Sequence, residues 1–186
     1  MNAPVGWMDQ FKTQVEAAGG RVVVCGSREE AGFAIGQELS QRNVEGVHVG
    51  GLGAGWVRTF QEVPVFRRVK LLEGPVISPD GIPEVGVGEA DYAIAETGTL
   101  VEIGWGRERH LLSLLPPVHI ALLAEDRILP DLDAFFTVLP PLLCQGPRPR
   151  IVFITGPSRS ADIEKLLILG AHGPRELIVV VYPPPK

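Results

Sequence analysis

Residues 21–41 read RVVVCGSREEAGFAIGQELSQ, a strand pattern followed at once by a helix pattern. The opening run, RVVVC, is short, β-branched and apolar, which is typical of a strand buried on both faces in a parallel sheet. Ser27 then stands where a helix N-cap is expected, and Glu29 and Glu30 place negative charge in the first turn, where it favours the helix dipole. We therefore predict a strand over 21–25 and a helix that runs to about Gln41.

The same alternation continues along the rest of the chain. Apolar residues at helical spacing between Met8 and Ala18, ahead of Gly19-Gly20, predict an N-terminal helix. Further strands are predicted over 47–49, 69–72, 118–123, 150–155 and 177–182, and further helices over 130–139, opened by its proline, and 161–170. This order predicts an α/β fold with a mostly parallel sheet.

One segment departs from this alternation. Residues 85–103 read VGVGEADYAIAETGTLVEI and contain two alternating apolar runs, Tyr92 to Ala95 and Thr99 to Ile103. The short connection between the runs contains glycine, which is typical of a turn between antiparallel strands. We therefore predict a tight antiparallel hairpin here.

Length and composition indicate one ordered domain over residues 1–186. The chain has 45% hydrophobic and 21% charged residues, a globular pattern, and a chain of this length buries roughly 70% of its unfolded surface. Its formal net charge is −5, so the overall field would repel a phosphate backbone. We therefore expect no nucleic-acid partner and no attraction to anionic membranes.

The two cysteines, Cys25 and Cys144, lie far apart and form no CxxC pair. A disulfide framework and a thiolate-held iron–sulfur cluster are therefore not expected in this chain. The histidines show no HxH or HExxH spacing, so no metal site is predicted either. Residues 1–9 lack a leader pattern and no apolar run approaches a transmembrane length, so we expect a cytoplasmic protein without membrane insertion.

Residues 50–55 read GGLGAG directly after the strand predicted at 47–49. This run matches neither the dinucleotide-binding GxGxxG pattern nor the phosphate-binding loop, which requires a lysine that is missing here. Nucleotide binding is therefore the less favoured interpretation. We expect a flexible loop near a pocket, in which glycine permits positive φ angles.

The segment 155–162, TGPSRSAD, is the strongest local candidate for a binding site. A strand that ends in such a loop ahead of a helix aims backbone N–H groups at one point, and open α/β sheets bind ligands beyond the carboxyl ends of their strands. An ordinary capped helix, with Ser160 as its N-cap, is the equally weighted alternative. The residues expected to contact a carboxylate or phosphate are Gly156, Pro157, Ser158, Arg159 and Ser160.

The hairpin turn is the second candidate site. Glu96 is the candidate general base or nucleophile, because apolar runs on both sides would leave it little solvent and burial raises the pKa of a carboxylate. Thr97, Gly98 and Thr99 would then hydrogen-bond a polar substrate. In the alternative, Glu96 lies in water and the threonines serve only the turn and the strand.

Two histidines are weaker candidates for ligand contact. His119 lies inside an apolar strand pattern, where a histidine is more often a hydrogen-bonded core residue. His172 lies beside Gly173 in a loop before the last strand. Both histidines and Gly173 are retained as candidate contacts for a small anion.

Ser113 and the arginines at 107 and 109 are weaker candidates still. Ser113 has no GxSxG elbow around it, which disfavours a serine hydrolase. Arg107 and Arg109 are expected in a solvated loop, and holding a carboxylate or docking an acidic partner is the alternative.

Four stretches together resemble the LUD-domain family, and within it the lactate-utilisation C group. They are ADYAIAETGTL (90–100), SLLPPVHIALL (113–123), ITGPSRSADIE (154–164) and LGAHGP (169–174), so the resemblance spans about residue 85 to the C-terminus. Four motifs in the right order are specific, whereas the N-terminal half fits the family only in general layout. Glu102 departs from the family pattern, because an apolar residue is commoner there, and we expect it to face solvent at the strand end.

The resemblance implies a three-layer α/β/α fold similar to ribose-5-phosphate isomerase, glucosamine-6-phosphate isomerase and CoA transferases. It also implies a non-redox accessory subunit of a bacterial system that oxidises L-lactate to pyruvate. This chain would carry no cofactor, and iron–sulfur clusters would lie in partner subunits. Two alternatives stay open: a stand-alone isomerase or acyl/CoA-transferase-like enzyme that uses Glu96, and a sensor or scaffold that binds a small carboxylate.

Overall fold

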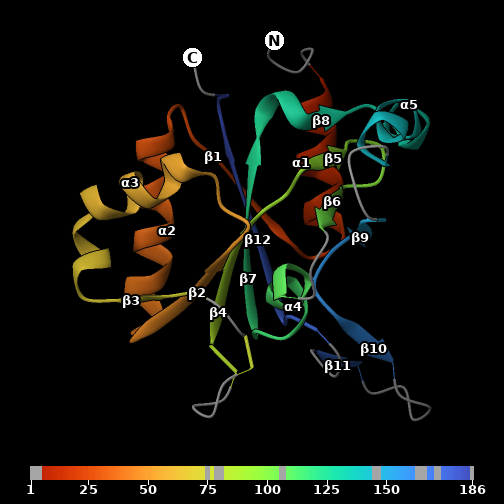
Figure 1. The fold of residues 1–186 in the computed structure, drawn as a ribbon. Coiled ribbons are helices and arrows are strands. Elements are labelled where there is room, and N and C mark those ends of the chain that lie inside the picture. The colour runs from red at the N-terminus through yellow and green to blue at the C-terminus, as the bar shows by residue number, and fades with distance from the viewer. Residues whose placement is uncertain are drawn as a thin grey trace.

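The structure, a computed structural model, describes residues 6–73, 76–77, 82–104, 108–143, 148–161, 167–169 and 173–184 (Figure 1). Its helices are α1 (Trp7–Ala17), α2 (Arg28–Arg42), α3 (Ala54–Glu62), α4 (Glu108–Leu114) and α5 (Leu132–Leu143), with 3₁₀ turns η1 (Pro64–Arg67) and η2 (Glu125–Arg127). Its strands are β1 (Arg21–Val24), β2 (Gly46–Gly50), β3 (Lys70–Leu72), β4 (Val85–Glu89), β5 (Tyr92–Ile94), β6 (Thr99–Gly104), β7 (Val118–Ala124), β8 (Ile128–Leu129), β9 (Arg150–Ile154), β10 (Arg159–Ala161), β11 (Leu167–Leu169) and β12 (Glu176–Tyr182).

A six-stranded sheet forms the centre of the molecule, in the order β1-β12-β7-β4-β2-β3. Every neighbouring pair in it is parallel, which confirms the predicted α/β class. The strands predicted at 21–25, 47–49, 69–72, 118–123 and 177–182 all belong to this sheet.

The strand–helix unit of residues 21–41 forms as predicted, with one correction. Ser27 Oγ accepts a hydrogen bond from the Glu30 backbone N–H at 3.1 Å, so Ser27 caps α2. β1 packs on both faces of the sheet, through Val22 and Val23, but it is an edge strand bordered only by β12 and is not fully buried, since Val24 is 52% exposed.

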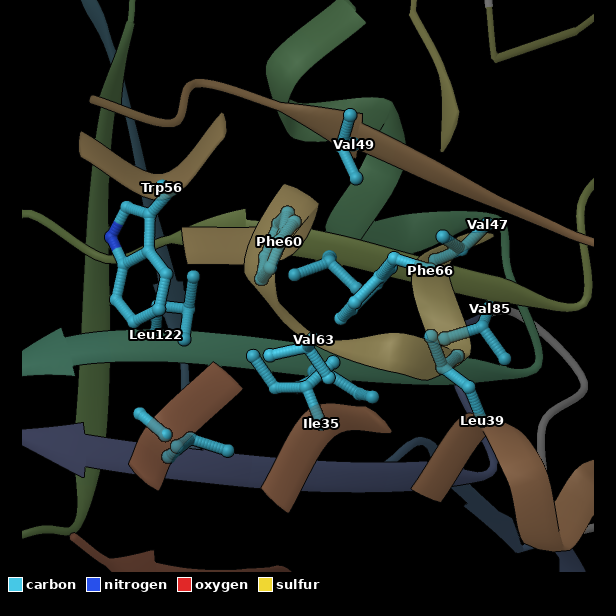
Figure 2. Close-up of a cluster of buried hydrophobic side chains, with 14 of the residues drawn as sticks. Ile35, Leu39, Val47, Val49, Trp56, Phe60, Val63, Phe66, Val85 and Leu122 are labelled. Carbon is cyan, nitrogen blue, oxygen red and sulfur yellow. The ribbon is translucent and has the colours of Figure 1, made fainter. Parts of the chain in front are cut away.

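Helices α2 and α3 cover one face of the parallel sheet. Figure 2 shows the contact between them, in which Ile35 and Leu39 of α2 and Trp56 and Phe60 of α3 pack over the valines of the sheet. These four side chains are at most 1% exposed. Burial of this apolar surface is the main term that holds the two helices against the sheet.

The opposite face is covered by α1 and by a second sheet. α1 packs through Phe11 and Val15 against the sheet, as its predicted helical spacing requires. The second sheet has the order β8-β5-β6-β9, and α5 packs on it through Phe135 and Leu139. Helices, parallel sheet and the mixed layer of α1 with the second sheet therefore form the expected three layers (Figure 1).

The hairpin is confirmed, because β5 and β6 pair antiparallel with Tyr92 opposite Val101. The strand predicted at 150–155 also forms, as β9, but it was expected to be buried and it is not. It pairs antiparallel with β6 at the edge of the second sheet, and Phe153 is 46% exposed. An apolar run of this length does not reveal which sheet a strand joins.

Helix α5 begins later than predicted and ends later. Asp131 Oδ1 accepts the Ala134 N–H at 2.8 Å and so caps the helix, and the proline at 130 precedes it. The helix continues through Pro140 and Pro141 in its last turn. Among the described residues, no helix combines the length and the apolar character needed to cross a bilayer.

The helix predicted over 161–170 is wrong wherever the structure describes that segment. β10 and β11 pair antiparallel, with Ser160 opposite Ile168, so Ser160 does not cap a helix. Residues 162–166 and 170 lie outside the described residues. The apolar pattern at 163–169 is too short to distinguish a helix from a strand by spacing.

Charged groups tie α2 to the amino ends of the strands it covers. Glu38, 8% exposed, pairs with Arg21 of β1 at 2.6 Å and with Arg42 of its own helix at 3.4 Å.

Glu38→Ala is expected to lower the free energy of unfolding by about 1–2 kcal/mol, because two arginines lose a largely desolvated acceptor. Urea denaturation checks this, with the exposed Glu62→Ala as control. Equal losses in the two variants would contradict the assignment.

Candidate functional site

A pocket of about 530 Å³ lies at the carboxyl ends of the parallel strands. Its wall includes Glu89 at the end of β4, Ala124 at the end of β7, Tyr182 at the end of β12 and Gly51 just after β2. The chain leaves β2 toward β3 at one edge, but passes from β4 through β7 to β12 in the other direction. Open α/β sheets bind ligands at such a switch point.

A second, more open groove of about 1030 Å³ lies between α2 and η1. Its lining includes Phe33, Val65, Arg67 and Arg68, and none of the described lining residues has an acidic or imidazole side chain. Acid–base chemistry has no candidate there, so we place the functional site at the carboxyl-end pocket.

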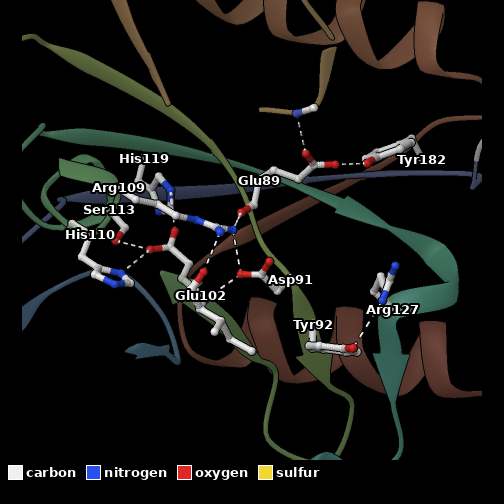
Figure 3. A network of polar contacts seen from close by, with 12 residues as sticks. Glu89, Asp91, Tyr92, Glu102, Arg109, His110, Ser113, His119, Arg127 and Tyr182 are labelled. Carbon is white, nitrogen blue, oxygen red and sulfur yellow. Dashed lines mark hydrogen bonds and ion pairs between the residues drawn. The ribbon is translucent and has the colours of Figure 1, made fainter. Parts of the chain in front are cut away.

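Arg109 of α4 organises the inner wall of this pocket. Its guanidinium donates to the backbone oxygens of Ile103 at 2.7 Å and Glu89 at 2.6 Å, and to Asp91 Oδ2 at 2.7 Å (Figure 3). Asp91 also accepts the Ile103 N–H at 2.6 Å. Burial raises the pKa of Asp91, and Arg109 offsets part of that rise. The arginine therefore joins α4, β4 and β6 in one fixed arrangement.

A buried carboxylate, Glu102, lies next to Arg109 in Figure 3. Ser113 Oγ donates to Glu102 Oε2 at 2.7 Å. His110 Nδ1 lies 3.7 Å from Oε2, and His119 Nε2 lies 3.7 Å from Oε1. We call these four residues the Glu102 cluster; all are buried, with Glu102 2% and His119 0% exposed.

The protonation of the Glu102 cluster follows from its burial together with its polar neighbours. Burial alone would raise the pKa of Glu102, but His110, His119, Ser113 and Arg109 together hold it below its usual value. Burial lowers the pKa of His119, although Glu102 opposes that shift. We therefore describe Glu102 as ionised and His119 as neutral at neutral pH.

Both imidazoles of the cluster have unused hydrogen-bonding capacity. None of the ring nitrogens of His110 and His119 has a hydrogen-bond partner among the described residues. A buried carboxylate between imidazoles can accept, hold and release a proton. Within the described part of the chain, no three His, Cys, Asp or Glu side chains are placed to hold a metal ion.

Acidification is expected to destabilise the protein through His119. Because the pKa of His119 is below its unfolded value of 6.5, the unfolded chain binds a proton there that the folded chain does not. This contribution to stability is therefore lost as the pH falls below about 6.5. His119→Asn should show a shallower loss between about pH 7.5 and about pH 5.5 in urea denaturation. Equal losses in the two proteins would refute this role for His119.

The outer wall of the pocket holds a second carboxylate, Glu89. The Tyr182 hydroxyl donates to Glu89 Oε1, and the Gly53 N–H donates to Oε2 at 3.1 Å. Burial and this carboxylate raise the pKa of Tyr182. The glycine-rich segment 50–55 therefore does border a pocket, as expected, and α3 begins within it.

The two predicted motifs around Glu96 and Thr155 meet each other, but not at this pocket. Thr99 Oγ1 lies 2.7 Å from Thr97 Oγ1 and 2.9 Å from Thr155 Oγ1, so a chain of hydroxyl hydrogen bonds links the hairpin turn to the end of β9. Glu96 is exposed, which corrects the expectation that flanking apolar runs would bury it. A hairpin turn projects beyond its strands, so its side chains reach water.

The loop at 156–160 differs from the predicted anion site. The Ser158 N–H donates to the Pro174 oxygen at 2.7 Å, so it is not free for a ligand, and β10 follows where a helix was expected. Gly173 lies beside Ser158, and Gly156 lies against α1. Of Arg159 and Ser160 only the backbone is described, and His172 is outside the described residues. None of the loop residues Gly156, Pro157 and Ser158 lines the carboxyl-end pocket.

The structure therefore places the candidate site at residues that the sequence patterns did not favour. His119 is the one predicted contact that lies in the Glu102 cluster. Glu102 was expected in solvent, but every residue of β6 is buried, because layers cover both of its faces. Arg109 was expected in a solvated loop, but it lies in α4 with its side chain 21% exposed; Arg107 lies outside the described residues.

Comparison with known proteins connects the site to a family. The LUD-domain profile matches residues 83–182, a range that contains Glu89, Asp91, Tyr182 and the whole Glu102 cluster. A protein named Lactate utilization protein C from Halalkalibacterium halodurans is 36% identical over 100 residues, covering 53% of this chain and 44% of that protein. One of the same name from an Exiguobacterium species is 38% identical over 93 residues, covering 49% and 40%. The match thus covers less than half the length of these relatives.

A solved structure supports the fold over almost the whole chain. The crystal structure of a DUF162 family protein from Deinococcus radiodurans superposes with a TM-score of 0.66, covering 97% of this chain and 98% of that one. Its sequence identity is 23%, so the likeness concerns the fold alone. The profile match extends over more than half of the chain, from the start of β4 through β12. This chain belongs to the LUD-domain family.

Proposed function

We propose that this protein acts in lactate utilisation, as a subunit of a system that oxidises L-lactate to pyruvate. The observation that carries the proposal is the similarity to proteins named Lactate utilization protein C, together with the LUD-domain match over residues 83–182, which contains the Glu102 cluster. The conversion removes two electrons and two protons from lactate. This chain would contribute the pocket, and partner subunits would carry the electrons.

The cysteine content of this chain is the reason why we assign the electron-carrying groups to partner subunits. Iron–sulfur clusters are held by sets of cysteine thiolates, and this chain has only two cysteines. Burial and the nearby Glu30 raise the pKa of Cys25 to about 11, so its thiol stays protonated at neutral pH. We place iron–sulfur centres in partner proteins for this reason, as part of the same proposal.

A second candidate function is a stand-alone enzyme of the isomerase or acyl-transfer type. The observation that favours it is the buried Glu102, with a serine hydroxyl and two imidazoles around one carboxylate. Glu102 would then act as the base, in place of the exposed Glu96. Turnover of sugar phosphates or CoA esters by the purified chain alone would support this candidate.

Lactate-dependent reduction of an artificial electron acceptor tests the main proposal. The rate is measured for this chain alone, for its iron–sulfur partners alone, and for the mixture. We expect activity in the mixture only, and loss of growth on lactate when the coding sequence is deleted. Full activity of the partners alone, with unchanged growth of the deletion strain, would contradict the proposed role and leave a sensor or scaffold.

A further inference from the structure

The carboxyl-end pocket is larger than lactate requires. Its volume of about 530 Å³ lies within the range of roughly 300–1,000 Å³ that is usual for sites of cofactor-sized ligands. A three-carbon acid would leave most of this space to water. The size of the pocket therefore favours an occupant of several linked groups.

Arg28 is a charged group on the wall of this pocket that forms no ion pair with the described residues. Its guanidinium carbon lies 5.4 Å from the ring centre of Trp56 and 5.6 Å from that of Tyr182, and both rings are nearly fully buried. Its Nε is buried and has no hydrogen-bond partner. Stacking on aromatic rings holds the guanidinium in place without using its donors.

The Trp56 indole beside Arg28 already has a partner. It interacts with the Tyr182 hydroxyl, and this interaction opposes the rise in the pKa of Tyr182. The buried Arg28 Nε, by contrast, has no acceptor among the described residues. Buried N–H groups without acceptors cost free energy, so native proteins rarely keep them without a partner. The Arg28 guanidinium therefore indicates an acceptor that arrives with a ligand.

The backbone around Arg28 leaves room for its guanidinium. A Cβ built at Gly55, in the first turn of α3, would lie 2.2 Å from Arg28 Nη1. Any larger residue at position 55 would displace the guanidinium from its place between α3 and the aromatic rings. The position of Arg28 is therefore specified by residues from two other elements, Gly55 and Trp56 of α3 and Tyr182 of β12.

Most of the other charged side chains that line the pocket already have partners. Arg109 is bonded to Asp91 and to two backbone oxygens. Both oxygens of Glu89 accept hydrogen bonds, from Tyr182 and from Gly53. Arg127, by contrast, donates to the Tyr92 hydroxyl at 3.3 Å and lies over the Tyr92 ring, and it enters no ion pair among the described residues. The exposed Asp126 is the remaining acid on the wall.

We propose that this pocket binds an anion larger than lactate, with Arg28 as its main contact and Arg127 as a second. The ligand class is a polycarboxylate or a phosphate-bearing molecule, because planar guanidinium groups pair with the oxygens of either. The pocket spans from Arg28 to Arg127, so both arginines can contact one extended ligand. This inference concerns the same pocket as the lactate proposal, but it does not depend on that role.

Calorimetric titration of the purified chain tests the site directly. The probes are L-lactate, citrate, pyrophosphate and coenzyme A, so that small and large anions, and carboxylates and phosphates, are compared. We expect at least one of the three larger probes to bind at least about tenfold more tightly than lactate. Binding of none of them, or equal binding of lactate, would overturn the proposal.

Variants of the chain identify the contact. Arg28→Gln should weaken binding of that probe by about tenfold or more, because a charge-assisted hydrogen bond is lost. Gly55→Ala should also weaken it, since the guanidinium is displaced while its charge is kept. Arg127→Gln should have a smaller effect, and Arg58→Gln, whose side chain is 85% exposed on the same helix as Gly55, should have none. Binding that survives both Arg28→Gln and Gly55→Ala would refute the site.

The tests of the two proposals are independent of each other. The titration uses this chain alone, without partner subunits and without electron transfer. A negative titration would leave the lactate assay unaffected, and a negative lactate assay would leave the anion site intact.

Discussion

Glu102→Ala is expected to lower the free energy of unfolding by about 3–5 kcal/mol, one of the two largest effects we predict. The change removes the acceptor of the Ser113 hydroxyl at 2.7 Å and the only described carboxylate that faces both His110 and His119. It also opens a cavity in a region where every surrounding residue of β6 is buried.

Glu102→Gln is the matched variant for this prediction. Glutamine keeps the volume and one acceptor oxygen, so its loss should be smaller, about 1–2 kcal/mol. Both variants are measured by urea denaturation at neutral pH. A loss below about 1 kcal/mol for Glu102→Ala would show that the cluster does not support the fold.

Gly98→Ala is the second large effect, with an expected loss of about 3 kcal/mol or more. Gly98 has φ +65° in the hairpin turn, and a Cβ there would lie 2.6 Å from the Val15 backbone nitrogen and 2.7 Å from the Gln14 carbonyl carbon. Because these are backbone atoms of α1, the helix itself would have to move. The hairpin would then separate from α1.

Gly51→Ala provides the control for Gly98→Ala. Gly51 has the same φ of +65°, but its nearest neighbour is Nε of the Arg109 side chain, at 3.0 Å. This contact is less close than those at Gly98 and is made to a side chain rather than to backbone, so the loss should be smaller, about 1–2 kcal/mol. Thermal or urea denaturation of both variants separates the cost of backbone strain from the cost of the contact with α1. Equal losses would mean that contact with α1 contributes nothing.

The sequence predicted those helices and strands that are determined by residues close together in the chain. Ser27 caps α2 because its hydroxyl reaches an N–H three residues later, and both ends of that hydrogen bond are visible in the sequence. The runs at 118–123 and 177–182 form central strands because continuous β-branched and apolar residues suit a sheet covered on both faces. Such features need no knowledge of distant partners.

The site could not be predicted in the same way, because its contacts join distant segments. Glu102 is buried because β6 joins a second sheet and His119 comes from β7 of the first. Arg28 looks like an ordinary first-turn residue in the sequence, and its surroundings come from Gly55 and Tyr182. One signal was available: a single charge within the apolar run 99–104 is costly unless it is paired.

The most direct test of the account compares Glu102→Gln with Glu96→Gln in the lactate-dependent reduction assay of the reconstituted mixture. Both variants remove one carboxylate, but Glu102 is buried next to Arg109, which lines the pocket, and Glu96 is exposed at the hairpin turn. We expect Glu102→Gln to lower the rate by about tenfold or more, and Glu96→Gln to stay within about twofold of the unmodified protein. A large loss in Glu96→Gln with full activity in Glu102→Gln would place the site at the hairpin turn and contradict the account.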